Sequence, residues 1–186
     1  RAKFFSMLPR SVAILSSGDV PKGLEGPFYA NSNFYYLTGI TEPSVVAILS
    51  TASIEPQYVL FWKEADAKEK VWSGPRLSLK EAKKVFGAHK VFPFHKLAEK
   101  LPQYLTGAEK LYWNLGVEPH LDKMILQSRD NLLRIKYIPR IVPTAICDTS
   151  ELMERLRLHK GEEEISAIRK AIEITASSGA AEPEPM

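Results

Sequence analysis

Short apolar runs separated by turn residues dominate the first half of the chain. The runs at residues 12–15, 45–49 and 58–62 are rich in β-branched, leucine and aromatic side chains. Such short, nearly continuous apolar runs are typical of strands covered on both faces. The segment 50–57 has a length that suits a hairpin-type connection between two of them. We therefore predict three buried strands at these runs.

A fourth run differs in the polar residues that precede it. The polar residues Asn31-Ser32-Asn33 precede the aromatic segment that starts at Phe34, and Gly39 and Glu42-Pro43 follow it. Aromatic residues bounded by turn formers indicate a strand. We predict a strand over residues 34–40, entered by a polar loop of the kind that often holds a ligand. An ordinary core strand without a ligand remains the alternative interpretation.

Helical spacing appears further along the chain. Ser78 and Glu81 form a capping-box pattern and Gly87 is a typical helix end, so a helix is predicted between them. Leucines four residues apart predict another helix over 95–105, which Pro102 should kink or split. A helix is also predicted at 119–131, and extended segments at 91–92, 111–113 and 138–142. Strands alternating with helices favour an α/β fold with a mixed sheet flanked by helices.

The last part of the chain has only helical patterns. Asp148 and Glu151 mark the start of one helix, and Gly161 followed by three glutamates marks a second. Isoleucines in the second helix repeat at helical spacing, and such an apolar stripe needs a partner, so we expect a further domain after it. We predict an α/β domain at 1–146, linker helices at 147–176 and a disordered tail at 177–186.

Composition excludes several classes of protein. The 186 residues suffice for one core, and the net charge of +3 is spread along the chain without a basic stripe, so no nucleic-acid partner is indicated. The longest clean apolar run, 45–49, is far too short to cross a membrane. Cys147 is the sole cysteine, which excludes an internal disulfide and fits a reducing, cytoplasmic location.

Candidate chemistry is sparse. The four histidines include no pair with metal-ligand spacing, and the aspartates lie where helix caps and surface charges are expected. Phosphate-loop and nucleophile-elbow patterns do not occur in the sequence. The residues themselves therefore predict neither a catalytic group nor a metal site.

A second segment, Trp72-Ser73-Gly74-Pro75-Arg76, combines a large aromatic, a stiff turn and a guanidinium. This combination suits stacking on a ligand and anchoring a carboxylate. A tryptophan folded onto its own domain beside a solvated arginine is an equally open interpretation.

At these two segments the sequence resembles the amino-terminal domain of the creatinase/aminopeptidase P family. The shared motifs occur in the family's order: Pro27-Phe28, Asn31-Ser32, Phe34 to Gly39, Glu42-Pro43, Leu60-Phe61, Trp72-x-Gly74-x-Arg76, and the junction Leu156-Arg157 to Lys160, Glu164-Ile165 and Arg169-Lys170-Ala171.

The resemblance implies a fold like the creatinase/aminopeptidase amino-terminal domain and a parent Xaa-Pro aminopeptidase, a metalloprotease that acts on peptides with proline in second position. In that family a carboxy-terminal pita-bread domain holds two divalent metals, usually manganese, through two Asp, one His and two Glu. This ligand set is not in the chain, so the chain alone should be inactive. It would comprise the amino-terminal domain, the linker and the first helix of the catalytic domain.

The resemblance also implies site residues. Family amino-terminal domains build a homo-oligomer, here a dimer or tetramer, and lend side chains to an active site. Trp72 matches such a side chain, so Trp72 and Arg76 are predicted substrate-cleft or intersubunit contacts. Asn33 takes the place of the family's aspartate and Tyr29 that of its arginine, so both are also predicted substrate-cleft or intersubunit contacts. A peptide- or protein-binding module with a degenerate or absent catalytic domain, and a prolidase- or creatinase-type hydrolase, remain alternatives.

Overall fold

A computed structural model describes residues 1–20, 28–53, 57–63, 76–135 and 141–179. The chain divides into two compact units, Arg1–Leu152 and Met153–Met186. We describe each unit by itself.

The first unit is built on a six-stranded mixed sheet. Its order is β4 (Lys90–Pro93), β3 (Gln57–Trp62), β2 (Val45–Ser50), β1 (Ser11–Ser16), β5 (Lys110–Tyr112) and β6 (Ala145–Cys147). The β1–β2 and β2–β3 pairs are antiparallel, and the β1–β5, β3–β4 and β5–β6 pairs are parallel. The predicted mixed sheet is confirmed, as are the three long apolar strands and the short ones at 91–92 and 111–113. Strand β6 was not predicted.

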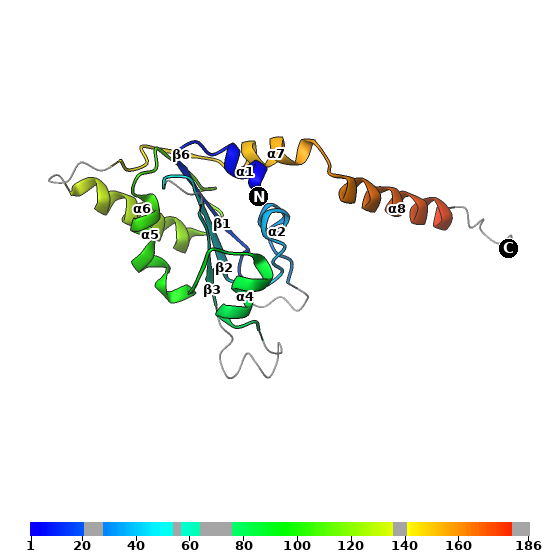
Figure 1. The fold of residues 1–186 in the computed structure, drawn as a ribbon, viewed down its shortest axis with the longest axis horizontal. Coiled ribbons are helices and arrows are strands. Elements are labelled where there is room, and N and C mark those ends of the chain that lie inside the picture. Colours follow the sequence, from blue (N-terminus) through cyan, green and yellow to red (C-terminus); the bar gives the residue numbers. More distant parts are fainter. Residues whose placement is uncertain (21–27, 54–56, 64–75, 136–140, 180–186) are drawn as a thin grey trace. The chain divides into compact units, whose positions relative to one another are not determined.

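Helices lie on both faces of this sheet. In Figure 1, α5 (Leu97–Leu105) and α6 (Pro119–Arg134) cover one face, while α2 (Ser32–Thr38) and α4 (Leu79–Phe86) lie on the other. The short elements α1 (Ala2–Ser6) and η1 (Phe94–Lys96) complete the helical part of this unit before its last residues. Coverage on both faces explains why β1, β2 and β3 are almost wholly buried.

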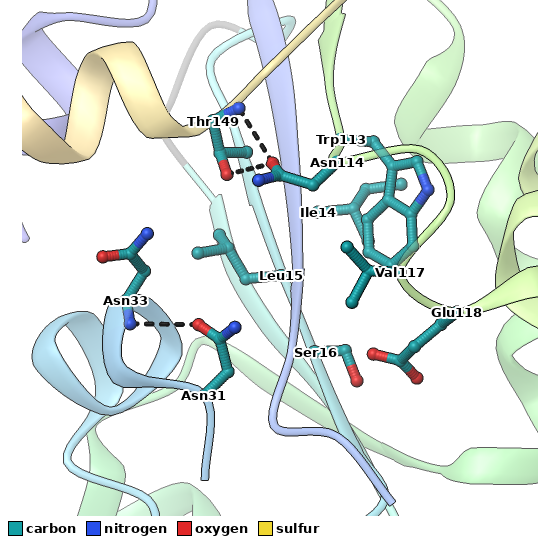
Figure 2. Close-up of a pocket in the computed structure, with 10 residues that line it drawn as sticks. All are labelled: Ile14, Leu15, Ser16, Asn31, Asn33, Trp113, Asn114, Val117, Glu118 and Thr149. Atoms are coloured by element: carbon teal, nitrogen blue, oxygen red, sulfur yellow. Dashed lines mark hydrogen bonds between the residues drawn. The ribbon is translucent and has the colours of Figure 1, made fainter.

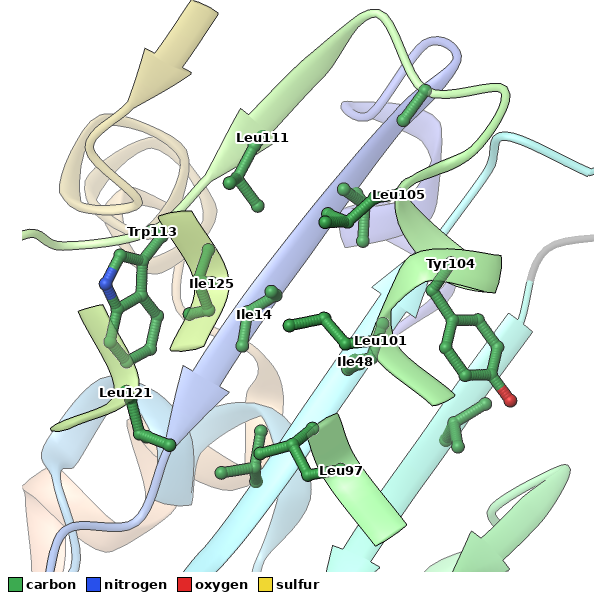
Figure 3. Close-up of a cluster of buried hydrophobic side chains, with 14 of the residues drawn as sticks. Ile14, Ile48, Leu97, Leu101, Tyr104, Leu105, Leu111, Trp113, Leu121 and Ile125 are labelled. Atoms are coloured by element: carbon green, nitrogen blue, oxygen red, sulfur yellow. The ribbon is translucent and has the colours of Figure 1, made fainter. Parts of the chain in front are cut away.

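The core under α5 and α6 is a continuous cluster of buried apolar side chains. Leu101 and Leu105 of α5 and Ile125 of α6 pack over Ile14 and Leu111 of the sheet (Figure 3). Burying an aliphatic side chain of this size contributes about 1.5–3 kcal/mol. The leucine spacing that predicted α5 is therefore the stripe that attaches this helix to the sheet.

Helix α5 departs from expectation at Pro102. The helix continues through this residue to Leu105, so the predicted split does not occur. Proline removes one backbone donor, which leaves the Ala98 carbonyl without its usual helical partner. Burial of the leucine stripe on both sides of Pro102 offsets this loss.

Residues 34–38 belong to helix α2, so the strand predicted over 34–40 is wrong. Asn31 caps α2: its side-chain Oδ1 accepts from the backbone N–H groups of Asn33 at 3.0 Å and Phe34 at 3.2 Å. Gly39 ends the helix in the left-handed region at φ 72°. Phe34 and Leu37 are buried at helical spacing, whereas Tyr35 between them is 52% exposed. Asn31 and Gly39 thus mark the two ends of a helix that the aromatic composition obscured in the sequence.

The other predicted helices are confirmed. Ser78 and Glu81 form the capping box of α4, and Gly87 ends that helix. Helix α6 covers the predicted 119–131 and extends to Arg134. Of the extended segment predicted at 138–142, residues 138–140 lie outside the described residues.

Two helices form the rest of the chain. Helix α7 (Ser150–Leu158) begins where the Asp148 carboxylate accepts from the Ser150 backbone N–H at 2.6 Å. Helix α8 (Glu162–Gly179) begins where Glu164 accepts from the Gly161 N–H at 2.9 Å. Residues 177–179 are helical, so the tail predicted at 177–186 starts too early. Residues 180–186 lie outside the described part of the chain.

Candidate ligand pocket at the strand ends

A pocket lies where the parallel strands β1 and β5 end. We call it the strand-end pocket, and its volume is about 60 Å³. The chain leaves β1 toward α2 on one face of the sheet and leaves β5 toward α6 on the other. Such a divergence at the carboxyl ends of parallel strands opens a crevice in which α/β proteins often bind ligands. Its lining residues are Ile14, Leu15, Ser16, Asn31, Asn33, Trp113, Asn114, Val117, Glu118 and Thr149.

Polar groups from three segments face each other in this pocket. The Glu118 carboxylate, just before α6, extends toward the Ser16 hydroxyl at the end of β1 (Figure 2). The Asn31 side chain approaches from the α2 side. Asn31 is held there because its backbone N–H donates to the Ser17 carbonyl at 2.9 Å. The β1 end therefore positions both walls of the pocket.

The far side of the pocket is fixed by Asn114 and Thr149. The Asn114 Oδ1 accepts from the Thr149 backbone N–H at 2.9 Å and from the Thr149 hydroxyl. Trp113 is held nearby, because its indole N–H donates to the Asp122 carboxylate at 2.6 Å. The other Asp122 oxygen accepts from the Gly116 N–H at 2.9 Å. These bonds make the loop between β5 and α6 a rigid wall.

Glu118 has an altered acidity. Burial raises the pKa of its carboxyl above the ordinary value, and the neighbouring Asp19 and Asp122 carboxylates act in the same direction. A hydrogen bond with Ser16 and the nearby His120 oppose this shift. The ionised form of Glu118 is therefore incompletely compensated by the groups around it.

Asp19, Glu118 and His120 also approach one another. Each offers a ligand atom, and the three atoms lie within 4.8 Å of one another. The Asp19 and His120 side chains are 55% and 51% exposed, and the His120 Nε2 lies 4.0 Å from the Asp19 Oδ2. The sequence did not predict this grouping, because Asp19 follows β1 whereas Glu118 and His120 lie at the start of α6, and only the fold brings these two segments together.

The four predicted site residues have different positions. Asn33 lines the strand-end pocket and is half-buried. Tyr29 is 83% exposed. Arg76 contacts the Glu42 carboxylate at 3.3 Å and donates to the Lys63 carbonyl at 3.2 Å, so it joins two of the quoted motifs instead of lining the pocket. Trp72 lies outside the described residues.

Sequence reasoning missed Ser16, Asn114 and Glu118. Nothing local distinguishes these residues from ordinary strand-end and cap residues. The available signal was their place directly after two predicted strands, because the carboxyl ends of parallel strands meet at one edge of a sheet. This signal could be used only once the pairing of β1 with β5 was known.

The fold and the site together define the class of protein. It is a mixed α/β domain with a polar pocket at the ends of its strands. Residues 1–112 match the model of the aminopeptidase P, N-terminal domain. The chain belongs to this family.

Curated relatives and solved structures agree with that assignment. The Xaa-Pro aminopeptidase of Escherichia coli is 28% identical over 174 residues, which is 91% of this chain and 40% of the relative. The mitochondrial intermediate cleaving peptidase 55 of Arabidopsis thaliana is 27% identical over 180 residues, which is 94% of this chain and 34% of the relative. Zn-substituted E. coli aminopeptidase P in complex with product matches with a TM-score of 0.83 at 27% identity, over 96% of this chain and 41% of that one.

The chain therefore spans about two fifths of the length of its E. coli relative. Among the described residues, no helix has both the length and the apolar character needed to span a membrane.

Proposed function

We propose that this chain is the non-catalytic amino-terminal part of a metal-dependent Xaa-Pro aminopeptidase, in which it frames the substrate cleft and contributes to a homo-oligomer. The observation that carries the proposal is the strand-end pocket. Part of its lining comes from residues 1–112, which match the family model, including Asn31 of a shared motif and Asn33 at the place of the family's aspartate. The hydrolysed bond would be the one before a proline in second position of a peptide.

The metals of the parent enzyme would be held outside this chain. The family's set of two Asp, one His and two Glu does not fit the described residues, whose candidate group of three is Asp19, Glu118 and His120. We therefore assign this chain no step of the metal chemistry. Two divalent ions, such as manganese, would be bound by the remaining length that relatives possess. A cytoplasmic location stays a prediction.

The direct test compares the 186-residue chain with the same chain extended by its downstream reading frame. With added Mn²⁺, the extended protein is expected to release the first residue of an Xaa-Pro peptide, and the 186-residue chain is expected to release none. Turnover by the short chain, or none by the extended protein, would contradict the proposal. Cleavage of proline dipeptides alone, or of creatine, by the extended protein would favour the prolidase or creatinase alternative.

Framing of the cleft is tested with Asn33→Ala in the extended protein. Loss of one pocket-lining amide is expected to raise KM about threefold to tenfold, which corresponds to the net energy of one hydrogen bond, while kcat changes less. Ser32→Ala is the matched control, because Ser32 is the exposed neighbour on the same helical turn. Equal KM values for both variants would show that Asn33 does not contribute to the substrate cleft.

The oligomer is tested by sedimentation of the extended protein and of the 186-residue chain. A dimer or tetramer is expected for the extended protein. A strictly monomeric extended protein with full activity would remove oligomerisation from the proposed function.

A further inference from the structure

We propose that the strand-end pocket binds a primary ammonium group, with the Glu118 carboxylate as the charged acceptor. This inference rests on the proposed function for the source of that group, which would be the free amino end of a peptide. The binding site itself is argued from the residues of the pocket.

The charge of the pocket favours a cation. Among the ten lining residues that the structure describes, Glu118 alone carries a formal charge, and none is a lysine or an arginine. The ionisable groups that act on Glu118 are Asp19 and Asp122, which are acidic, and His120. A cationic group that enters the pocket therefore meets a carboxylate that has no basic partner among the pocket residues. An anion would meet repulsion.

Three neutral side-chain acceptors of the pocket already have donors. The Asn31 Oδ1 accepts two backbone N–H groups of α2, and the Asn114 Oδ1 accepts from Thr149. The Ser16 hydroxyl oxygen accepts from the Gly18 N–H at 3.1 Å. The Glu118 carboxylate has two oxygens and several lone pairs. It thus has capacity for a new donor, and an ammonium supplies three donors.

Burial makes such a partner favourable. The raised pKa of Glu118 reflects removal of its carboxylate from water. A bound ammonium would restore by a charge-assisted hydrogen bond part of what the carboxylate lost in solvation. The volume of about 60 Å³ suits a small polar head group. The remainder of the ligand would extend out of the pocket.

A divalent cation is the competing occupant. Asp19 and His120 could join Glu118 as ligands, but both side chains are more than half exposed. One Asp19 oxygen also accepts from the Ser44 hydroxyl at 2.6 Å. Exposed charges are well solvated and gain little from pairing. The ammonium assignment needs only the half-buried Glu118, so we favour it.

The test is a titration of the ¹⁵N-labelled 186-residue chain with alanyl-prolinamide, with N-acetyl-alanyl-prolinamide and with ZnCl₂. The free amine is expected to shift the backbone resonances of Ser16, Asn33 and Asn114, and the acetylated compound is expected to leave them unchanged. Glycinamide, which shares only the ammonium group and a primary amide, is expected to shift the same resonances.

The decisive variant is Glu118→Gln, which keeps the shape of the side chain and removes its charge. It is expected to weaken alanyl-prolinamide binding about tenfold, the usual order for a charge-assisted hydrogen bond. Glu99→Gln is the matched control, since Glu99 is an exposed glutamate of α5 outside the pocket, and its binding should equal that of the unmodified chain. A folded spectrum for each variant excludes loss of structure as the cause.

Three results would overturn the inference: equal binding of the acetylated compound, unweakened binding by Glu118→Gln, or shifts around Glu118 and His120 with ZnCl₂ but none with either amine. The last result would assign the pocket to a divalent cation. Failure here is separable from failure of the proposed function, because Xaa-Pro hydrolysis by the extended protein is measured independently. If the extended protein is active but the 186-residue chain binds no amine, the ammonium site is refuted and the proposed function is not.

Discussion

Asn31 has two roles in one side chain. Its amide oxygen caps α2, and the residue lines the strand-end pocket next to the β1 end. A capping residue is held by hydrogen bonds to the backbone and so has little rotational freedom. The same bonds that start the helix therefore also fix one wall of the candidate site.

Replacing Asn31 tests the cap. Asn31→Ala is expected to lower the free energy of unfolding by about 1 kcal/mol, because two N–H groups of the first turn lose their acceptor. Urea unfolding of the 186-residue chain, followed by circular dichroism, measures this change. Ser32→Ala serves as the control, with an expected change below about 0.5 kcal/mol. Equal effects of the two substitutions would contradict the capping role.

Glu118 gives a pH-dependent prediction. Its folded-state pKa is raised above the ordinary 4.5, so the folded chain keeps a proton that the unfolded chain has released. The resulting contribution to stability is fully present below the unfolded value and is lost as pH rises through the folded pKa. Relative to Glu118→Gln, the unmodified chain should therefore lose free energy of unfolding as pH rises from the ordinary value of 4.5 through the raised folded-state pKa.

Urea unfolding of both proteins across this pH range measures the difference. Glu99→Gln is the control with the opposite sign, because Lys96 lowers the pKa of Glu99. Parallel stability curves for Glu118→Gln and the unmodified chain would show that the Glu118 carboxyl is not perturbed.

At the scale of elements, α2 and α5 show the limits of local patterns. The caps of α2 were visible in the sequence as Asn31 and Gly39, but the aromatic content between them suggested a strand. Helix α5 was correctly predicted from its leucines although Pro102 should interrupt it. In both cases packing against the sheet decided the outcome, because buried apolar area outweighs the small differences in intrinsic propensity.

Pro102 supplies a prediction at this scale. Pro102→Ala is expected to raise the free energy of unfolding by about 1–2 kcal/mol, because alanine provides the missing donor to the Ala98 carbonyl. Part of the gain is offset by the greater freedom of the unfolded chain without proline. Thermal and urea unfolding measure the effect, and Gln103→Ala, an exposed change in the same helix, is the control. A loss of stability would mean that the proline ring itself fills a needed position.

For the whole molecule, the two units differ in how much apolar surface they bury. The sheet and its helices enclose a continuous core, whereas α8 leaves Ile168 48% and Ile172 61% exposed. An isolated helix of this length is only marginally stable in water. The remaining length of the relatives would supply a covering surface under the proposed function.

Amide hydrogen exchange of the monomeric 186-residue chain tests this difference. Amides of α8 are expected to exchange far faster than those of α6, because few buried contacts oppose opening of α8. The extended protein should slow the exchange of α8 while leaving α6 unchanged. Strong protection of α8 in a proven monomer would contradict the expectation.

The sequence by itself determined the three long strands, the capped helix α4, the leucine face of α5 and the family resemblance. Each of these depends on residues close together in the chain, which form a periodic pattern, a helix cap or a motif. Only the tertiary structure decided that residues 32–38 are helical and that Glu118 meets Ser16 and Asn31 in one pocket. That meeting depends on the parallel pairing of β1 with β5, a non-local contact that no local pattern specifies.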